Sequence, residues 1–265
     1  MAATPLVSAT PRRLEGKVAI ITGGASGIGE STVRLFIHHG AKVLIADIQD
    51  ELGNSLCQEL DSPESITYVH CDVTSDTDVK NTVDLAITKY GKLDIMFCNA
   101  GISGILESRI VATDNEDFKR VFDVNLFGVF LGAKHAARVM IPATKGSIIL
   151  TSSVASVSAL GSGYAYEASK HAVVGLAKNL CVELGKVGIR VNCISPYAVA
   201  TPIMRAFVGM TEKEKFEKVV SSAANLKGVT LEAGSKYVSG INLVIDGGYS
   251  TTNPSFQREV NNLFS

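Results

Sequence analysis

Short apolar runs alternate with segments of helical periodicity along almost the whole chain. The runs cover 18–21, 42–46, 66–70, 93–98, 148–153, 190–194 and 241–245, and most of them end in a polar or small residue. The segments between them, such as 76–90 and 115–140, repeat apolar residues at helical spacing. Runs of this length with little internal alternation are typical of strands buried on both faces.

Strands that alternate with helices predict an α/β protein. We expect a single doubly wound Rossmann-type domain over 14–250, built on a parallel seven-stranded sheet with helices on both faces. The Ala/Thr/Pro-rich start, 1–13, is interpreted as a flexible tail, and 251–265 as a C-terminal tail. Ligands of such folds bind outside the carboxyl ends of the strands.

A glycine-rich turn follows the first strand and opens the first helix. Its pattern is Gly23-x-x-x-Gly27-x-Gly29, with Ser26 directly before Gly27 and Ile28 directly after it. Glycines let the backbone approach a pyrophosphate, and the helix N-terminus supplies N–H groups and the positive end of its dipole. The context predicts a dinucleotide site, although the spacing differs from the Gly-x-Gly-x-x-Gly pattern of larger dehydrogenases.

Asp47 ends the second strand, near the spacing of about 20 residues at which a ribose-binding carboxylate follows such a turn. A carboxylate there accepts hydrogen bonds from the adenosine ribose and repels a 2′-phosphate. No arginine follows directly, so the position favours NAD over NADP; the alternative is a helix-capping Asp.

Polar or small residues also end other strands. Asp72, after the third strand, suits either the adenine amino group or a cap for the helix over 76–90. Asn99, Ala100 and Gly101 end the fourth strand, where small residues let a backbone pass close to a cofactor. Asn125 lies inside a long helical segment, where Asn is unfavourable, and is either solvated or marks a local break.

Ser153, Tyr166 and Lys170 form the candidate catalytic group. Ser153 ends the fifth strand, while Tyr166 and Lys170 are four positions apart and share one face of the following helix. A neighbouring ammonium lowers the pKa of a phenol from its ordinary value of about 10. A tyrosine tuned in this way can take the proton of an alcohol while hydride leaves the same carbon.

Composition narrows the remaining possibilities. The 265 residues are 46% apolar with a net charge of −1, so no basic surface for nucleic acid is indicated. No apolar run reaches the roughly 18 residues of a membrane span. The five cysteines are irregularly spaced, which favours a reducing compartment, and we expect the cytoplasm. The five histidines lie in no metal-binding pattern, so no metal is expected.

Taken together, these motifs resemble the short-chain dehydrogenase/reductase family. The resemblance spans almost the whole chain and rests on Thr22, Gly23, Gly27, Gly29, Asp72, Asn99, Ala100, Gly101, Asn125, Ser153, Tyr166 and Lys170. The segments 14–18 and 194–202 are similar to those of the plant NAD-dependent alcohol dehydrogenases, a group that includes secoisolariciresinol, xanthoxin and borneol dehydrogenases.

The resemblance implies a role for each residue. Tyr166 is the acid/base, Lys170 binds the nicotinamide ribose and lowers the tyrosine pKa, and Ser153 hydrogen-bonds the substrate oxygen. Asn125 orders a proton-relay water. The cofactor contacts implied in addition to the motifs are Ile48, Val73, Pro196, and Val199 and Thr201 at the nicotinamide carboxamide. A homotetramer is also implied.

The sequence departs from the family pattern in two places. Tyr197 follows Pro196, where the family usually has glycine. After Ala233, an expected alanine/leucine-rich crossover helix is missing, and about fifteen residues are absent, the length of one ordinary helix with its connections.

Two functions therefore remain open. The first is an NAD-dependent oxidoreductase that interconverts a hydrophobic secondary alcohol (terpenoid, phenolic or lignan-like) and its ketone, since the expected substrate lining over 102–110, 154–164 and 197–210 is largely apolar. The second is a catalytically impaired NAD-binding protein, because of the missing helix. An epimerase with the same Tyr/Lys pair is disfavoured, since the chain lacks a longer substrate domain.

Overall fold

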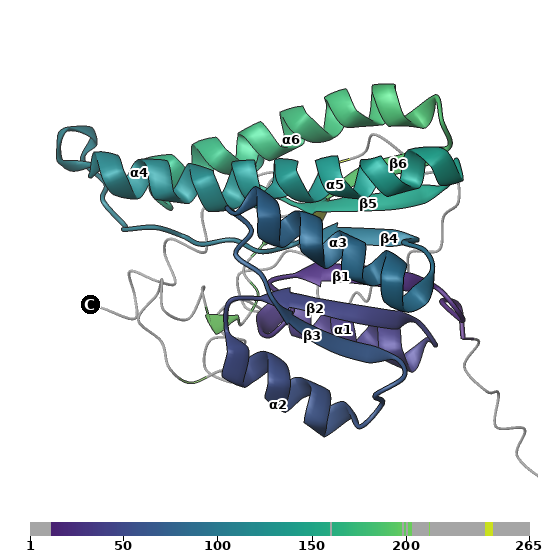
Figure 1. Ribbon diagram of the computed structural model, residues 1–265. Coiled ribbons are helices and arrows are strands. Elements are labelled where there is room, and N and C mark those ends of the chain that lie inside the picture. The colour runs from purple at the N-terminus through teal and green to yellow at the C-terminus, as the bar shows by residue number, and fades with distance from the viewer. Residues whose placement is uncertain are drawn as a thin grey trace, which may run out of the picture.

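The computed structural model describes residues 12–159, 161–197, 199, 201–202, 212 and 242–245. Seven parallel strands form one sheet in the order β3-β2-β1-β4-β5-β6-β7 (Figure 1), which confirms the predicted fold class. The strands are β1 Val18–Thr22, β2 Lys42–Asp47, β3 Ile66–His70, β4 Ile95–Cys98, β5 Gly146–Thr151, β6 Ile189–Pro196 and β7 Asn242–Ile245.

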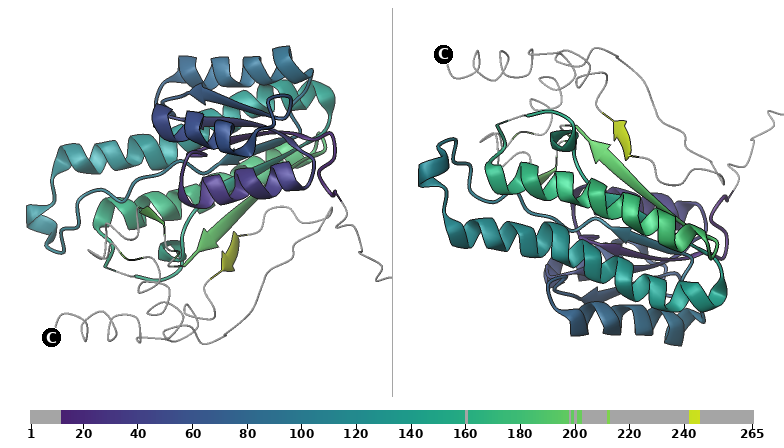
Figure 2. Two further views of the ribbon diagram at one scale, coloured as in Figure 1. Left: turned by 90° about the horizontal axis from the view of Figure 1, so that it is seen from below. Right: turned by 90° about the horizontal axis from the view of Figure 1, so that it is seen from above.

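Helices pack on both faces of the sheet, as Figure 2 shows. One face carries α1 Gly27–His38 on β1 and β2, and α2 Asp50–Leu60 on β2 and β3. The other carries α3 Asp76–Tyr90, α5 Gly128–Ala143 and α6 Tyr164–Gly185. Shorter elements complete the described chain: η1 Ile110–Ala112, α4 Asn115–Phe122, the π-helix η2 Asp123–Phe127, and η3 Val154–Ser156.

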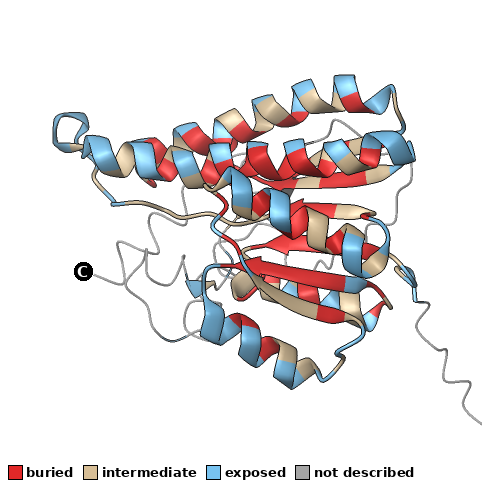
Figure 3. Ribbon diagram, in the orientation of Figure 1, coloured by how far each residue is buried: buried red, intermediate tan, exposed pale blue. Residues whose placement is uncertain are grey.

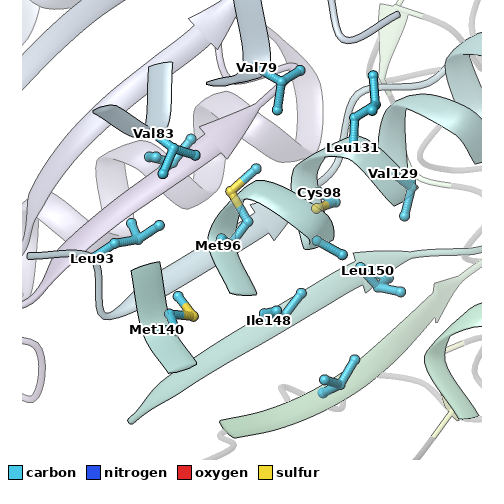
Figure 4. Packing of buried hydrophobic residues seen from close by; sticks show 14 of the residues in the cluster. Val79, Val83, Leu93, Met96, Cys98, Val129, Leu131, Met140, Ile148 and Leu150 are labelled. Carbon is cyan, nitrogen blue, oxygen red and sulfur yellow. The ribbon is translucent and has the colours of Figure 1, made fainter. Parts of the chain in front are cut away.

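The largest buried cluster lies between the sheet and α3, α5 and α6. Figure 4 shows Met96 and Cys98 of β4 and Ile148 and Leu150 of β5 meeting apolar side chains of α3 and α5. Because β1 and β2 are covered on both faces, their side chains are almost all buried (Figure 3). That is the physical reason why these strands read as continuous apolar runs in the sequence.

The long helical segment Asn115–Ala143 meets the length and composition of a membrane span, with a mean hydropathy of 1.2. More than half of that apolar window, 56%, is buried inside the protein. Its buried residues pack against α3, α6, β4 and β5. Its apolar character therefore follows from its position in the core.

The face of the sheet that carries α1 and α2 is less well covered by helices near β5 and β6. Ile95, Ile149 and Ile194 are only half-buried, although each is in a strand with a paired neighbour on either side. The register places Ile95 and Ile149 on the face that carries α1 and α2, and these two helices contact β1, β2 and β3. Among the described residues, no helix of that face covers β5 and β6.

The predicted tails 1–13 and 251–265 fall almost entirely outside the described residues, as does the predicted missing helix after Ala233. The half-buried isoleucines nevertheless lie on apolar sheet surface of the kind that such a helix would cover.

Candidate active site

A pocket of about 520 Å³ opens at the carboxyl ends of the strands. It is lined by nearly all of the residues that the sequence singled out: Gly23, Ser26, Gly27, Ile28, Asp47, Ile48, Asp72, Val73, Asn99, Ala100, Gly101, Ser153, Tyr166, Lys170, Pro196, Val199 and Thr201. Two predicted residues, Gly29 and Asn125, do not line it. The fold therefore gathers the glycine turn and the Ser/Tyr/Lys group around one cavity.

The glycine turn is built by close backbone approach. Gly23 has φ +63°, and a side chain there would meet the backbone of Ala100 at 2.8 Å. A Cβ at Gly29 would lie 2.0 Å from the carbonyl oxygen of Gly23. Gly29 therefore contributes by letting the turn fold back on the start of α1, while Gly23 and Gly27 form the pocket wall.

Asn99 joins this turn to the end of β4. Its amide nitrogen donates to the carbonyl oxygens of Thr22 (3.1 Å) and Gly23 (3.3 Å), and its backbone N–H donates to the Thr22 hydroxyl at 2.9 Å. The Thr151 hydroxyl donates to the Asn99 side-chain oxygen at 3.3 Å. The two sides of the pocket floor are thus held together by the hydrogen bonds of one side chain.

Asp47 lies in the pocket wall as a buried carboxylate with partners of its own. One oxygen accepts the N–H of Ala25 at 2.9 Å, and the other accepts the backbone and side-chain N–H groups of Gln49 at 3.0 and 3.1 Å. A carboxylate has about four acceptor positions, so at least one remains for a ligand hydroxyl. The N-cap of α2 is Gln49, so the alternative of Asp47 as that cap is wrong.

Asp72 is exposed at the other end of the pocket and does not cap α3. Ser75 is the N-cap and accepts the N–H of Asp78 at 3.2 Å, while Asp72 accepts from the N–H and hydroxyl of Thr74. Of the two readings of Asp72, the helix cap is therefore wrong.

Ser153 and Tyr166 meet at the opposite end of the pocket. A hydrogen bond from Ser153 favours the tyrosinate, but burial of the phenol outweighs it and raises the pKa of Tyr166. Lys170 is not among the groups that shift this pKa in the protein alone, and its ammonium lies over the ring face, 5.5 Å from the ring centroid. The protein alone therefore holds Tyr166 as a neutral phenol, in contrast to the prediction from the sequence.

Lys170 is buried, and its ammonium donates to the carbonyl oxygen of Thr151 at 3.0 Å. Burial lowers the pKa of Lys170 from 10.5 to about 8, since no carboxylate of the described chain pairs with it. An amine that is mostly charged at pH 7 is thus fixed beside Tyr166, within reach of any ligand in the pocket.

Removing this buried ammonium should stabilise the protein most below pH 8. At pH 7 Lys170 is charged in both the folded and the unfolded state, so the free energy of folding includes the cost of burying the charge. This cost decreases as the pH rises from the folded pKa to the unfolded value of about 10.4, because the amine loses its proton in both states. We expect Lys170→Met to raise the free energy of unfolding by about 2 kcal/mol more at pH 7 than at pH 10. Urea unfolding without added cofactor measures this difference, with Lys178→Met on the exposed side of α6 as control. An increase in the free energy of unfolding that is the same at pH 7 and pH 10 would contradict this prediction.

Asn125 is fully buried in the π-helix between α4 and α5, so the reading of a solvated Asn is wrong and that of a local break is right. Its side-chain oxygen accepts the N–H of Ile102 at 2.8 Å, and its amide nitrogen donates to the Ile102 carbonyl (2.9 Å) and the Ser169 hydroxyl (3.1 Å). The side chain therefore fastens the loop after β4 to α6. The predicted role in ordering a relay water stays a prediction.

Several residues that line the pocket were not predicted from the sequence: Ala46, Gln49, Cys71, Val124, Thr151 and Ser152. Each is one or two positions from a residue that was found. Thr151 and Ser152 precede Ser153, and their hydroxyls pointed to this strand end. Val124 is brought to the wall within a π-helix, which an α-helical pattern does not reveal.

The cysteines and histidines of the described chain lie in surroundings that indicate packing and ion pairing. All five thiols are free, and burial raises the pKa of Cys98 to about 12. His70 pairs with Asp50, and His135 pairs with Asp76. No cluster of metal-ligating side chains occurs in the part of the chain that the structure describes.

Known proteins match this chain over most of its length. A family model described as enoyl-(acyl carrier protein) reductase matches residues 23–250. "Short chain aldehyde dehydrogenase 1" of Euphorbia lathyris is 58% identical and covers 97% of this chain and 96% of its own. Secoisolariciresinol dehydrogenase of Forsythia intermedia is 55% identical, with 96% of each chain covered. The crystal structure of levodione reductase matches with a TM-score of 0.82 at 29% identity, over 91% of this chain and 100% of that one.

The alignment with the Euphorbia protein also bears on chain length. It spans 275 positions, more than the 265 residues present here, so it passes over positions that this chain lacks. This agrees with an internal segment missing from the present chain. The pocket, the strand order and these matches together show that the chain belongs to the short-chain dehydrogenase/reductase family, an oxidoreductase family with a Rossmann-type fold that typically binds a nicotinamide cofactor.

Proposed function

We propose that the protein is an NAD-dependent alcohol dehydrogenase that interconverts a hydrophobic secondary alcohol and its ketone. The observation that carries this proposal is that Ser153, Tyr166 and Lys170 share one pocket with the glycine turn and Asp47. A dinucleotide fits the residues present, since the cradle at Gly23 and Gly27 would be filled by side chains. When bound, the nicotinamide supplies the hydride acceptor or donor.

The protein's own residues would hold the substrate and move its proton. Ser153, placed by the N–H of Ala155 at 3.2 Å, orients the carbinol oxygen toward Tyr166. Tyr166 takes the hydroxyl proton in oxidation and returns it in reduction. The positive charge of Lys170 and of an oxidised nicotinamide would stabilise the tyrosinate, which burial alone disfavours. The phenol therefore becomes a competent base only in the loaded enzyme.

Cofactor choice rests on Asp47. Its buried carboxylate faces the pocket, and a 2′-phosphate beside it would meet a like charge in a poorly solvated place. Gly23, Gly27 and the N-terminus of α1 would hold the pyrophosphate, and Asp72 and Val73 the adenine end. Val199 and Thr201 line the pocket at the position assigned to the nicotinamide carboxamide.

Asp47→Ala combined with Ile48→Arg should narrow or reverse the preference for NAD over NADP. The change removes the repelling charge and adds a cation that can pair with a 2′-phosphate. The measurement is the ratio of kcat/KM for the two cofactors with one alcohol, and Ile48→Gln, which changes size but not charge, is the control. Equal use of both cofactors by the unaltered protein would remove Asp47 from this role.

The substrate class follows from the apolar part of the pocket lining. Ile102, Val124 and Val154 contribute apolar side chains to the pocket that also holds Tyr166. Relatives with related names include secoisolariciresinol dehydrogenase and the borneol dehydrogenases of Lavandula x intermedia and Salvia officinalis, which are 51–55% identical. We therefore assign terpenoid, phenolic or lignan-like alcohols to this pocket, and a panel of such alcohols with NAD tests the assignment.

A second candidate is an NAD-binding protein with impaired catalysis. The half-buried Ile149 and Ile194 favour it, because a poorly covered sheet end loosens the strands that carry Ser153 and Pro196. Measuring NADH binding and turnover on the same samples separates the two: binding without turnover of any alcohol in the panel supports the second.

We also propose a homo-oligomer, a tetramer, in the cytoplasm. Phe127, the last residue of η2, and Phe130 of α5 expose stacked rings, and Gly175 of α6 has open space around it. A second copy would bury this surface. Sedimentation of the purified protein measures the state of assembly.

A further inference from the structure

The pocket wall near Tyr166 holds a hydroxyl whose proton is already used within the protein. Ser162 is 9% exposed, lies two residues before α6 and lines the pocket. Its backbone N–H and its hydroxyl both donate to one oxygen of Glu167, at 3.0 and 3.1 Å. A serine hydroxyl has a single proton, so what Ser162 Oγ retains for a ligand is acceptor capacity.

The Glu167 carboxylate makes the hydroxyl oxygen of Ser162 a stronger hydrogen-bond acceptor. A hydroxyl that donates to a charged group is polarised by it and becomes a better acceptor in surroundings of low dielectric constant. The same pocket has apolar side chains in its lining, among them Ile102, Val124 and Val154. A polar atom in such a pocket favours ligands that can satisfy it and penalises ligands that bury it unpaired.

We propose that Ser162, held by Glu167, is a substrate-recognition site that accepts a hydrogen bond from a second hydroxyl of the substrate. Preferred substrates are then hydrophobic secondary alcohols that carry a further alcohol or phenol hydroxyl away from the reacting carbon. This inference rests on the proposed dehydrogenase function. It goes beyond that function because it specifies which group on the substrate is recognised, and by which side chain.

We expect Ser162 to discriminate sharply between substrates with and without the second hydroxyl, for one chemical reason. A methyl ether or a hydrogen at the same position offers no donor, so the Ser162 lone pairs would be desolvated without compensation. Sites built around a substrate hydroxyl reject analogues that lack it more strongly than apolar pockets reject an extra group. Glu167 is on the first turn of α6, next to Tyr166, but the pKa of Tyr166 is shifted by burial and by Ser153. The recognition role is therefore separable from proton transfer.

The test uses triplets of cyclic secondary alcohols that differ at one distal position, carrying hydroxyl, methoxy or hydrogen. Dissociation constants are measured by calorimetry with the protein saturated with NADH, which cannot transfer hydride to an alcohol. Several triplets with the distal group at different ring positions are compared. In the unaltered protein the hydroxyl member of at least one triplet should bind about tenfold more tightly than both partners.

Three variants then locate the effect. Ser162→Ala should bring the three dissociation constants of that triplet within about threefold of one another. Glu167→Gln, which keeps an acceptor for Ser162 but removes the charge, should leave an intermediate ratio. Ser62→Ala is the matched control, since Ser62 also donates its hydroxyl to a carbonyl, that of Leu60, but does not line the pocket, and it should keep the full ratio.

The outcomes are distinct. No triplet with a hydroxyl preference, no binding of any alcohol, or a preference that survives Ser162→Ala would overturn the inference, and the pair would then serve only to anchor the start of α6. Oxidation of the hydrogen member with NAD is measured separately. Absence of that turnover with an intact binding ratio would count against the proposed function and leave the recognition site standing.

Discussion

Tyr166→Phe should lower kcat by about 10²–10⁴-fold while the dissociation constant of NADH changes little. The substitution removes the phenol oxygen alone and keeps the ring that packs over the Lys170 ammonium at 5.5 Å. Lys170 stays anchored to the Thr151 carbonyl, and the glycine turn is untouched. Loss of turnover with retained cofactor binding is therefore the signature of a lost proton-transfer group.

The measurement pairs NADH fluorescence titration with steady-state oxidation of one alcohol. Tyr164→Phe is a matched control, because Tyr164 lies on the same helix and its hydroxyl donates to the Ser108 carbonyl at the surface. It should keep most of the turnover. If Tyr166→Phe retains more than a small fraction of the unaltered rate, Tyr166 is not the acid/base.

Insertion of an alanine/leucine-rich helix after Ala233 should raise both the melting temperature and the turnover. Ile95, Ile149 and Ile194 are half-buried on a sheet face where burial is otherwise almost complete. Covering three partly exposed isoleucines contributes about 2 kcal/mol, which corresponds to a rise of about 4–8 °C for a domain of this size. Turnover should rise because β5 and β6 carry Ser153 and Pro196 at their ends.

The control for this insertion is a Gly/Ser-rich segment of equal length, which restores chain length without an apolar face. This segment should raise neither the melting temperature nor the turnover. If the unmodified chain already matches the helix-bearing version in both melting temperature and turnover, the shorter connection is harmless and the second candidate function loses its support.

The parts of the fold that the sequence predicted are those governed by local pattern. The strands over 18–22 and 42–47 are buried runs with polar or glycine-rich ends, and such runs depend little on the rest of the chain. The glycine turn was predictable because Gly23 must adopt a positive φ beside Ala100. Ser153, Tyr166 and Lys170 followed from the order of strand, turn and helix.

The parts that were missed depend on contacts between distant segments. Gln49 reaches the pocket because its side chain bends back to Asp47, which no periodicity encodes. The π-helix at Asn125 exists where that side chain bonds Ile102 and Ser169, residues far away in the sequence. The pKa of Tyr166 is raised by burial of the phenol, and a spacing of four residues from Lys170 does not reveal how deeply distant segments bury it.

The hydrogen bonds of Gln49 to Asp47 have a consequence for the time that a nucleotide stays bound. Asp47 is already held within the protein, because the N–H groups of Ala25 and Gln49 donate to its two carboxylate oxygens. Departure of a ribose hydroxyl would therefore leave no unsatisfied buried charge, and we expect a lower barrier to dissociation than the contact alone would suggest. Product release limits the rate of many enzymes. A carboxylate with partners inside the protein should thus combine selectivity for the nucleotide with a short residence time.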